Sequence, residues 1–99
     1  MRRGSTPTLS FAVNLDLTTA TVYITFKQSY ETLLDKCSTD SSMTVTADTI
    51  TLTLTQEETV ALESGTCQCQ IRYKMPSGVA GASDIMTVDV KDILKDGVI

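Results

Sequence analysis

The segment Cys67–Lys74 limits the fold of this chain more than any other part of it. Its residues run Cys-Gln-Cys-Gln-Ile-Arg-Tyr-Lys, so apolar and polar side chains alternate strictly. In an extended chain successive side chains point to opposite faces, which puts every apolar residue of this segment on one side. A helix would scatter the same residues around its circumference. We therefore predict a β-strand here, with one face in a core and the other in water.

The composition favours strands along the rest of the chain. Thr occurs 17 times, Val 8 times and Ile 6 times, so 31 of the 99 residues are β-branched. Such side chains have restricted rotamers and pack well on a pleated surface. A chain of this length has enough residues for one thin hydrophobic core and no second lobe. We expect residues 1–99 to form a single all-β domain.

Six other segments carry apolar or β-branched residues between turn signals. They are residues 8–14, 20–28, 30–36, 43–45, 49–54 and 79–90. Together with Cys67–Lys74 they predict an antiparallel β-sandwich of about seven strands, immunoglobulin-like in layout. Gly81 is expected to mark a bulge where the last strand changes sheet.

One short helix is predicted near residues 56–62. The sequence Thr55-Gln56-Glu57-Glu58 has the form of a capping box, in which the Thr hydroxyl and the Glu carboxylate each accept a hydrogen bond from the other's backbone amide. Gly65 can adopt the left-handed conformation that ends a helix. The helix is long enough to span one end of the sandwich only.

The two ends of the chain carry the residues most suited to contacts with other proteins. Residues 1–6 are expected to be a flexible arm or an extension of a sheet edge, and residues 91–99 to leave the core as a tail. This tail holds more apolar side chains than a free tail needs. The residues expected to contact a partner are Arg2, Arg3, Ile93, Leu94, Val98 and Ile99.

The side chains that enzymes use are sparse, so we predict a protein without catalytic activity and without a cofactor. The chain has no His, the usual general base and the partner of a nucleophilic Ser or Cys. Glu57 and Glu58 are adjacent, and adjacent helical residues diverge by about 100°, so they cannot flank one bond. The spacing of the C-terminal acids fits no calcium loop of the EF-hand type, and solvation is the favoured interpretation. These acids are Asp84, Asp89, Asp92 and Asp96.

The three cysteines are expected to be buried free thiols. Cys67 and Cys69 lie two apart on one strand face, where a mutual disulfide would distort the backbone. Either one could meet Cys37 across a sheet, so that pairing stays as an alternative. A zinc site would need a fourth ligand that the sequence does not obviously supply.

The charges argue against nucleic acid and membranes as partners. The chain has 12 acidic and 8 basic residues, a net charge of −4, with the two signs interspersed. No basic stripe of the kind that binds nucleic acid is present. No polybasic run and no stretch of about 20 apolar residues is present either. With no secretory signal at Met1, we expect synthesis in the cytoplasm of the producing cell.

Four blocks spread along the whole chain carry a resemblance to a known family. They are Met1–Leu9, Val22–Gln28, Leu52–Thr59 and Leu94–Ile99. These blocks resemble small proteins encoded in tailed phages and prophages of Gram-positive gut bacteria. The layout is more distantly similar to the β-sandwich N-terminal domain of phage baseplate upper proteins. The resemblance implies a virion or tail component and supplies no catalytic residues. The family has valines at the positions of Cys67 and Cys69, which supports a core role for both thiols.

The main functional hypothesis is a structural or assembly module of a phage or prophage particle, in its tail, baseplate or neck. It would act through contacts with copies of itself or with other virion proteins, in the bacterial cytoplasm during synthesis and in the virion once assembled. The alternative is a module that binds saccharide or protein on the host surface through loops 38–42 and 75–81. Tyr23 and Tyr30 could form part of a sugar-stacking surface, but packing or a place at a sheet edge is the favoured interpretation of both tyrosines. A third hypothesis is a small inhibitor of a host defence enzyme.

Overall fold

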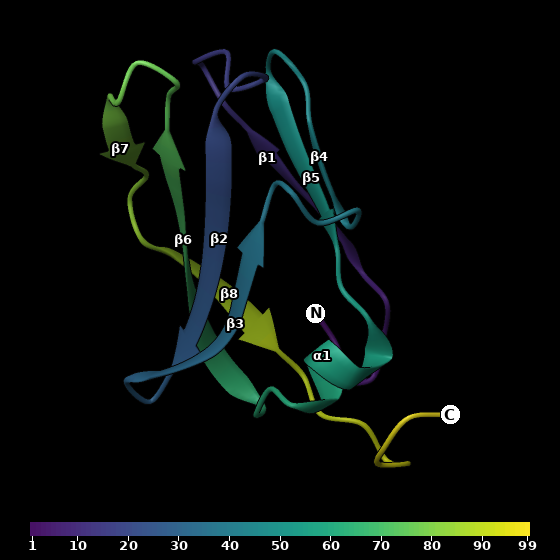
Figure 1. Ribbon diagram of the computed structural model, residues 1–99. Coiled ribbons are helices and arrows are strands. Elements are labelled where there is room, and N and C mark those ends of the chain that lie inside the picture. Colours follow the sequence, from purple (N-terminus) through teal and green to yellow (C-terminus); the bar gives the residue numbers. More distant parts are fainter.

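The computed structural model describes residues 1–99 and consists mostly of strands, which confirms the all-β class. The elements are β1 (Thr8–Ala12), β2 (Thr21–Gln28), β3 (Glu31–Cys37), β4 (Met43–Val45), β5 (Thr49–Thr53), α1 (Gln56–Val60), β6 (Gly65–Lys74), β7 (Ala80–Ala82) and β8 (Met86–Val90). The strands form two antiparallel sheets, and the single short helix lies at one end of the smaller sheet (Figure 1).

The larger sheet is built around the strand that the alternation in Cys67–Lys74 predicts. β6 pairs with β2 along one side, with Ile71 opposite Ile24, and with both β7 and β8 along the other side. β3 completes this sheet beyond β2, and the smaller sheet has the order β1-β5-β4. Cys67, Cys69 and Ile71 are buried, as the alternation predicts, whereas Tyr73 near the end of the strand is half-buried.

The last predicted strand, 79–90, is interrupted at a different place from the one expected. β7 and β8 both remain paired with β6, so the prediction that the chain changes sheet at a bulge at Gly81 is wrong. The interruption lies at 83–85, where Ser83 supplies hydrogen bonds in place of strand pairing. The Ser83 amide donates to Ile71 O (2.8 Å), and its hydroxyl accepts from Ile71 N (3.1 Å). Gly81 lies opposite Tyr73, and a Cβ atom there would overlap the Tyr73 ring. An aromatic side chain that covers an edge glycine in this way protects the strand pairing.

The hydrophobic core takes its side chains from both sheets. Alternate residues of β2 and of β5 point inward, and the threonines between them face outward. The thirteen buried apolar residues are Leu17, Val22, Ile24, Phe26, Met43, Ile50, Leu52, Leu54, Leu62, Cys67, Cys69, Ile71 and Val90. They form one narrow cluster along a molecule of 47 × 25 × 18 Å. The protein is elongated, so many apolar residues at the sheet edges are only half-buried.

The helix begins at the predicted capping box. Thr55 Oγ1 accepts from Glu58 N at 3.2 Å, and Glu58 Oε1 accepts from Thr55 N at 2.9 Å. The helix ends at Val60, two residues before the predicted end. The other carboxylate oxygen of Glu58 accepts from Lys36 Nζ at 2.8 Å, which ties the helix to β3.

The hairpin between β2 and β3 turns at Ser29 and Tyr30, one residue later than the predicted turn at 28–29. Both residues have positive φ angles, 50° and 65°, as a two-residue turn of type I′ requires. Gln28 instead ends β2 and is buried. Its side-chain amide donates to Glu63 O (2.7 Å) and accepts from Glu63 N (2.9 Å), so it fixes the hairpin to the loop before β6.

Candidate protein-contact site

The first residues of the chain extend the pairing beyond the end of β8. Arg2 and Lys91 form a parallel bridge, in which Lys91 N donates to Met1 O (2.7 Å) and Arg3 N donates to Lys91 O (3.0 Å). Ser5 O accepts a hydrogen bond from the buried hydroxyl of Thr59 at 2.8 Å. Of the two forms expected for residues 1–6, a flexible arm or an edge extension, the structure contains the extension.

Arg3 joins the end of the helix to the C-terminal segment. Its Nε and Nη2 donate to the carbonyl oxygens of Leu62 (2.7 Å) and Val60 (2.9 Å). Its Nη1 and Nη2 also donate to the carboxylates of Asp92 (2.8 Å) and Asp96 (3.2 Å). The planar guanidinium suits this role, because it offers several donors in a fixed geometry. Arg3, expected to contact a partner, is therefore engaged within its own chain.

These contacts shift the ionisation of the groups involved. The hydrogen bond to Asp92 raises the pKa of Arg3 above its ordinary value. The backbone amide of Ile93 and then Arg3 itself lower the pKa of Asp92. At neutral pH the Arg3 cation and the Asp92 carboxylate are both charged, so the C-terminal segment is held electrostatically as well as by hydrogen bonds.

The C-terminal segment is anchored, but three of its four apolar side chains are exposed to water. Leu94 is fully exposed, and Ile99 and Val98 are 83% and 51% exposed. Ile93 faces inward instead, over Gly4. The backbone amide of Ile99 donates to Gln56 Oε1 at 2.9 Å, which ties the end of the segment back to the helix.

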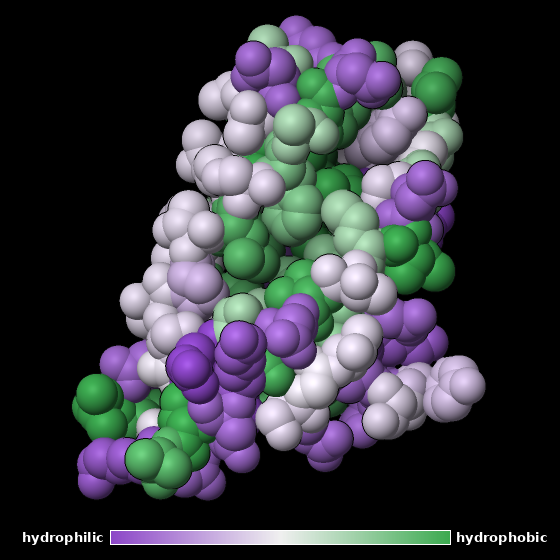
Figure 2. All heavy atoms as spheres, turned by 180° about the vertical axis from the view of Figure 1, so that it is seen from behind, coloured by the Kyte–Doolittle hydropathy of each residue, from purple (hydrophilic) through white to green (hydrophobic).

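We call the exposed part of this segment, Leu94, Lys95, Val98 and Ile99, the tail surface. Apolar side chains are visible where the C-terminal segment lies, at the lower left of Figure 2. Arg2 is exposed beside it and donates to Asp92 O at 2.9 Å. Of the six residues expected to contact a partner, the structure places four in solvent and turns Arg3 and Ile93 inward.

A second feature, an apolar groove, is one that the sequence did not reveal. It lies between the edge formed by β1 and the edge formed by β7 and β8, with a volume of about 790 Å³. Figure 2 shows a hollow with apolar side chains along the middle of this face. Its lining residues are Ser10, Phe11, Ala12, Val13, Asn14, Leu15, Leu17, Ile71, Tyr73, Ala82, Ser83 and Met86.

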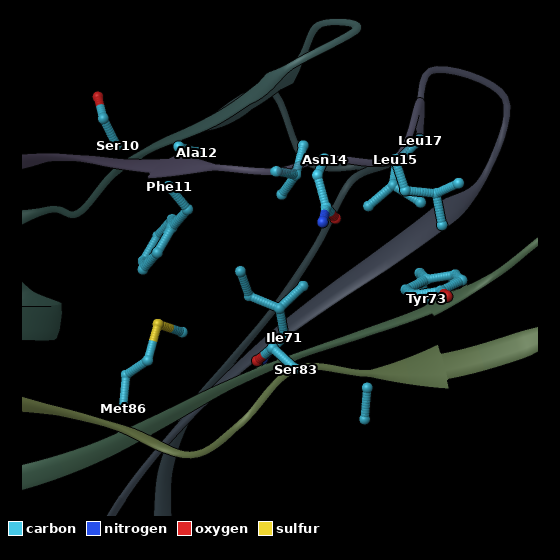
Figure 3. Close-up of a pocket in the computed structure, with 12 residues that line it drawn as sticks. Ser10, Phe11, Ala12, Asn14, Leu15, Leu17, Ile71, Tyr73, Ser83 and Met86 are labelled. Atoms are coloured by element: carbon cyan, nitrogen blue, oxygen red, sulfur yellow. The ribbon is translucent and has the colours of Figure 1, made fainter.

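The close-up shows how the two sheets line the groove (Figure 3). Phe11 and Met86 point toward each other from opposite edges, and Ile71 points into the groove beside them. Ser10 points away from the groove. β1 pairs only with β5, and β7 and β8 pair only with β6, so no strand closes the gap between the two edges. The side chains at these edges are therefore only half-buried. In the sequence they alternate with outward-facing residues, a pattern that would predict full burial in the core.

The outer face of the larger sheet has a smaller, polar hollow of about 280 Å³. Tyr23, Asp35, Arg72 and Lys74 are among the residues that line it. Tyr30, the other tyrosine considered for stacking, lies at the tip of the β2–β3 hairpin. The extended strand from Tyr23 to Gln28 spans about 17 Å and Tyr30 lies beyond its end, so the structure does not bring the two tyrosines together.

The three cysteines are free thiols. Cys67 and Cys69 are buried, and burial together with the neighbouring Cys67 raises the pKa of Cys69 to about 11. Burial also raises the pKa of Cys67. Both side chains are therefore protonated at neutral pH, and a protonated thiol is neither a nucleophile nor a metal ligand. They behave as small apolar core residues.

No family model, curated protein or solved structure matches the chain. No helix of the structure combines the length and the hydrophobicity that crossing a membrane requires. The tail surface and the apolar groove are therefore interpreted from their own geometry and chemistry.

Proposed function

We propose that this chain is a non-enzymatic structural module of a phage or prophage particle, in its tail, baseplate or neck, acting through protein–protein contacts. The observation that carries the proposal is the tail surface: Leu94 is fully exposed although the segment around it is tied down at Asp92, Asp96 and Ile99. A segment without a binding role could leave its apolar residues mobile. Here several hydrogen bonds hold the segment in place while its apolar side chains stay in solvent.

Anchoring of this kind favours binding. A partner that binds a mobile tail must order its backbone and side chains, and this ordering lowers the affinity. Arg3 and Gln56 order the backbone of the tail before any partner arrives. Exposed apolar residues bordered by charges are typical of protein interaction sites. The tail surface has this composition, with Lys95 beside Leu94.

The particle context rests on the resemblance in the four sequence blocks. We further propose that the two sheets form an immunoglobulin-like sandwich of seven strands, in which β7 and β8 count as one interrupted strand because both pair with β6. In this proposal the protein is synthesised in the bacterial cytoplasm and becomes part of the virion on assembly.

The test is incorporation of variants into particles. Leu94→Asp should strongly reduce the amount of the protein that mass spectrometry detects in purified particles. Leu94 is fully exposed, so the substitution leaves the core intact. Val79→Asp is the matched control, because Val79 is also exposed but lies in the β6–β7 hairpin loop. Equal incorporation of both variants, or absence of the wild-type protein from particles, would contradict the proposal.

A second candidate function is binding of a host-surface saccharide in the polar hollow around Tyr23. Tyr23 is 42% exposed and shares this hollow with the carboxylate of Asp35 and the guanidinium of Arg72. An exposed aromatic face beside polar groups suits a sugar ring. Binding on a glycan array that disappears in Tyr23→Ala would favour this function, and an array without any signal would count against it.

A further inference from the structure

We infer that the apolar groove receives the tail surface of a second copy of the chain, so that copies assemble head to tail. This inference rests on the proposed function, because it names the partner of the tail surface. It is carried by three observations: the groove is open and apolar, the tail surface is anchored and apolar, and the charges beside the two are opposite.

The groove has the size and lining of a binding site. Its volume of about 790 Å³ lies within the range of roughly 300–1,000 Å³ that ligand pockets have. Phe11, Met86 and Ile71 form an apolar floor, and Leu15, 42% exposed, stands at its rim. Aliphatic side chains that fill this space would remove the half-buried edge residues from water. The tail surface offers such side chains in Leu94, Val98 and Ile99.

The charges beside the groove are negative. Asp16 follows Leu15 in the loop after β1, and Asp84 follows Ser83 in the gap between β7 and β8. Both are exposed, and neither forms an ion pair. The nearby cations Arg72 and Lys74 alternate with the groove residues of β6 and face the opposite side of the sheet.

The uncompensated charges of the tail are positive. Four basic side chains, Arg2, Arg3, Lys91 and Lys95, lie with two acidic ones in and beside the tail. Both acids, Asp92 and Asp96, are paired with Arg3. Lys91 and Lys95 are exposed and have no ion-pair partner. A tail docked in the groove would therefore bring unpaired lysines toward unpaired aspartates. Complementary charges of this kind guide docking and fix its orientation.

The tail surface and the groove lie toward opposite ends of the long axis of the molecule. The C-terminus is at the bottom of Figure 1, and the loop after β1 that carries Leu15 is at the top. The anchored tail therefore cannot fill the groove of its own chain. Contacts between two different surfaces of identical chains repeat from copy to copy, and they produce rings or filaments.

Two matched leucine variants test the inference on the full chain. Leu15→Asp disables the groove, and Leu94→Asp disables the tail surface. Both side chains are exposed, so both variants should fold, which circular dichroism can verify. Analytical ultracentrifugation of the wild type up to roughly 1 mM should show concentration-dependent association. Each variant alone should associate at least roughly ten-fold more weakly.

A mixture of the two variants then distinguishes head-to-tail assembly from other forms of association. The Leu15→Asp chain keeps its tail and the Leu94→Asp chain keeps its groove, so an equimolar mixture should form dimers of one copy each and nothing larger. A charge exchange adds a second readout. The side chains of Asp84 and Lys95 make no hydrogen bond in the structure. Asp84→Lys and Lys95→Glu should each weaken association when introduced alone. The two substitutions together in one chain should restore it.

The results that overturn the inference differ from those that overturn the proposed function. A wild-type chain that stays monomeric at the highest concentration, or a mixture that forms no dimer, would overturn the inference. If Leu94→Asp still lost incorporation into particles in that case, the proposed function would stand with a different virion protein as the partner. Normal incorporation of Leu94→Asp would overturn the proposed function itself.

Discussion

The guanidinium of Arg3 lies 2.8 Å from a carboxylate oxygen of Asp92, although 89 positions of sequence separate the two residues. The side chain of Arg3 is largely covered, whereas Asp92 is 63% exposed, so water and salt screen the pair. Exposed ion pairs contribute little to global stability. The consequence of this contact is therefore local: it fixes where the C-terminal segment lies.

Replacement of Arg3 should release the tail and leave the sheets intact. In Arg3→Gln the amide of Ile99 should exchange with deuterium faster, because its acceptor Gln56 is held near the tail only while the segment is anchored. Amides in β6 should keep the protection that they have in the wild type. Arg72→Gln is the control, because the side chain of Arg72 makes no hydrogen bond in the structure. Unchanged exchange at Ile99 in Arg3→Gln would contradict the anchoring role.

The contact between Lys36 and Glu58 should make stability depend on pH in the acidic range. Desolvation raises the pKa of Glu58, but the Lys36 ammonium and the two hydrogen bonds with Thr55 outweigh it, so this pKa lies below its ordinary value of 4.5. A carboxyl whose pKa is lowered by folding stabilises the folded state above its ordinary pKa. This stabilisation is lost as the pH falls through the lowered value.

Denaturant unfolding of Glu58→Gln measures this contribution. The variant should be less stable than the wild type at pH 7 by about 1 kcal/mol, and the difference should shrink below pH 4.5. Glu57→Gln is the matched control, since Glu57 is exposed and has no side-chain partner. A difference between Glu58→Gln and wild type that is constant from pH 7 to pH 3 would contradict the assignment.

The buried thiol of Cys69 should lower stability at alkaline pH. Its pKa is raised from 9.0 to about 11 in the folded chain, so between these values the unfolded chain loses this proton and the folded chain keeps it. Stability from this group is complete below pH 9 and falls as the pH rises toward 11, by at most about 3 kcal/mol. Cys69→Val should have nearly wild-type stability at pH 7 and a smaller decrease above pH 9. Parallel pH curves for the two proteins would show that Cys69 titrates normally.

The loop before β4 contains a hydroxyl without a partner. Ser42 Oγ is buried and makes no hydrogen bond, whereas Ser38 Oγ accepts from Val22 N at 3.0 Å. An unsatisfied buried polar group costs about 1–3 kcal/mol. Ser42→Ala should therefore leave the free energy of unfolding unchanged or raise it, and the matched Ser38→Ala should lower it by about 1 kcal/mol. The opposite order of the two variants would show that Ser42 has a partner in solution.

The sequence predicts the strands because their signal is local. The alternation in Cys67–Lys74 gives the buried face of β6, and the spacing of Thr55 and Glu58 gives the capping box. The second partner of Glu58 could not be predicted, because Lys36 lies 22 positions away and reaches it only after the sheet and the helix have packed. Local patterns identify elements, and contacts between elements require the fold.

The candidate site shows the same limit. Arg3 and Ile93 are residue types that often contact partners, but within this chain Arg3 donates to Leu62 O and Ile93 packs over Gly4. The apolar groove was missed because alternation identifies Phe11 and Met86 as inward-facing residues without revealing that the edges of the two sheets stay apart. A signal was present in the interruption of 79–90, since Ser83 and Asp84 replace the apolar residues that a continuous strand would place there.

The most direct test of the contact role of the tail surface is covalent footprinting of Leu94 in two states. Hydroxyl-radical labelling should modify Leu94 rapidly in the isolated chain at low concentration and much more slowly in assembled particles. Val79, exposed in the isolated chain and outside the tail, serves as the reference. Protection of Leu94 relative to Val79 in particles is the predicted result. Equal labelling of Leu94 in both states would show that no protein covers the tail surface.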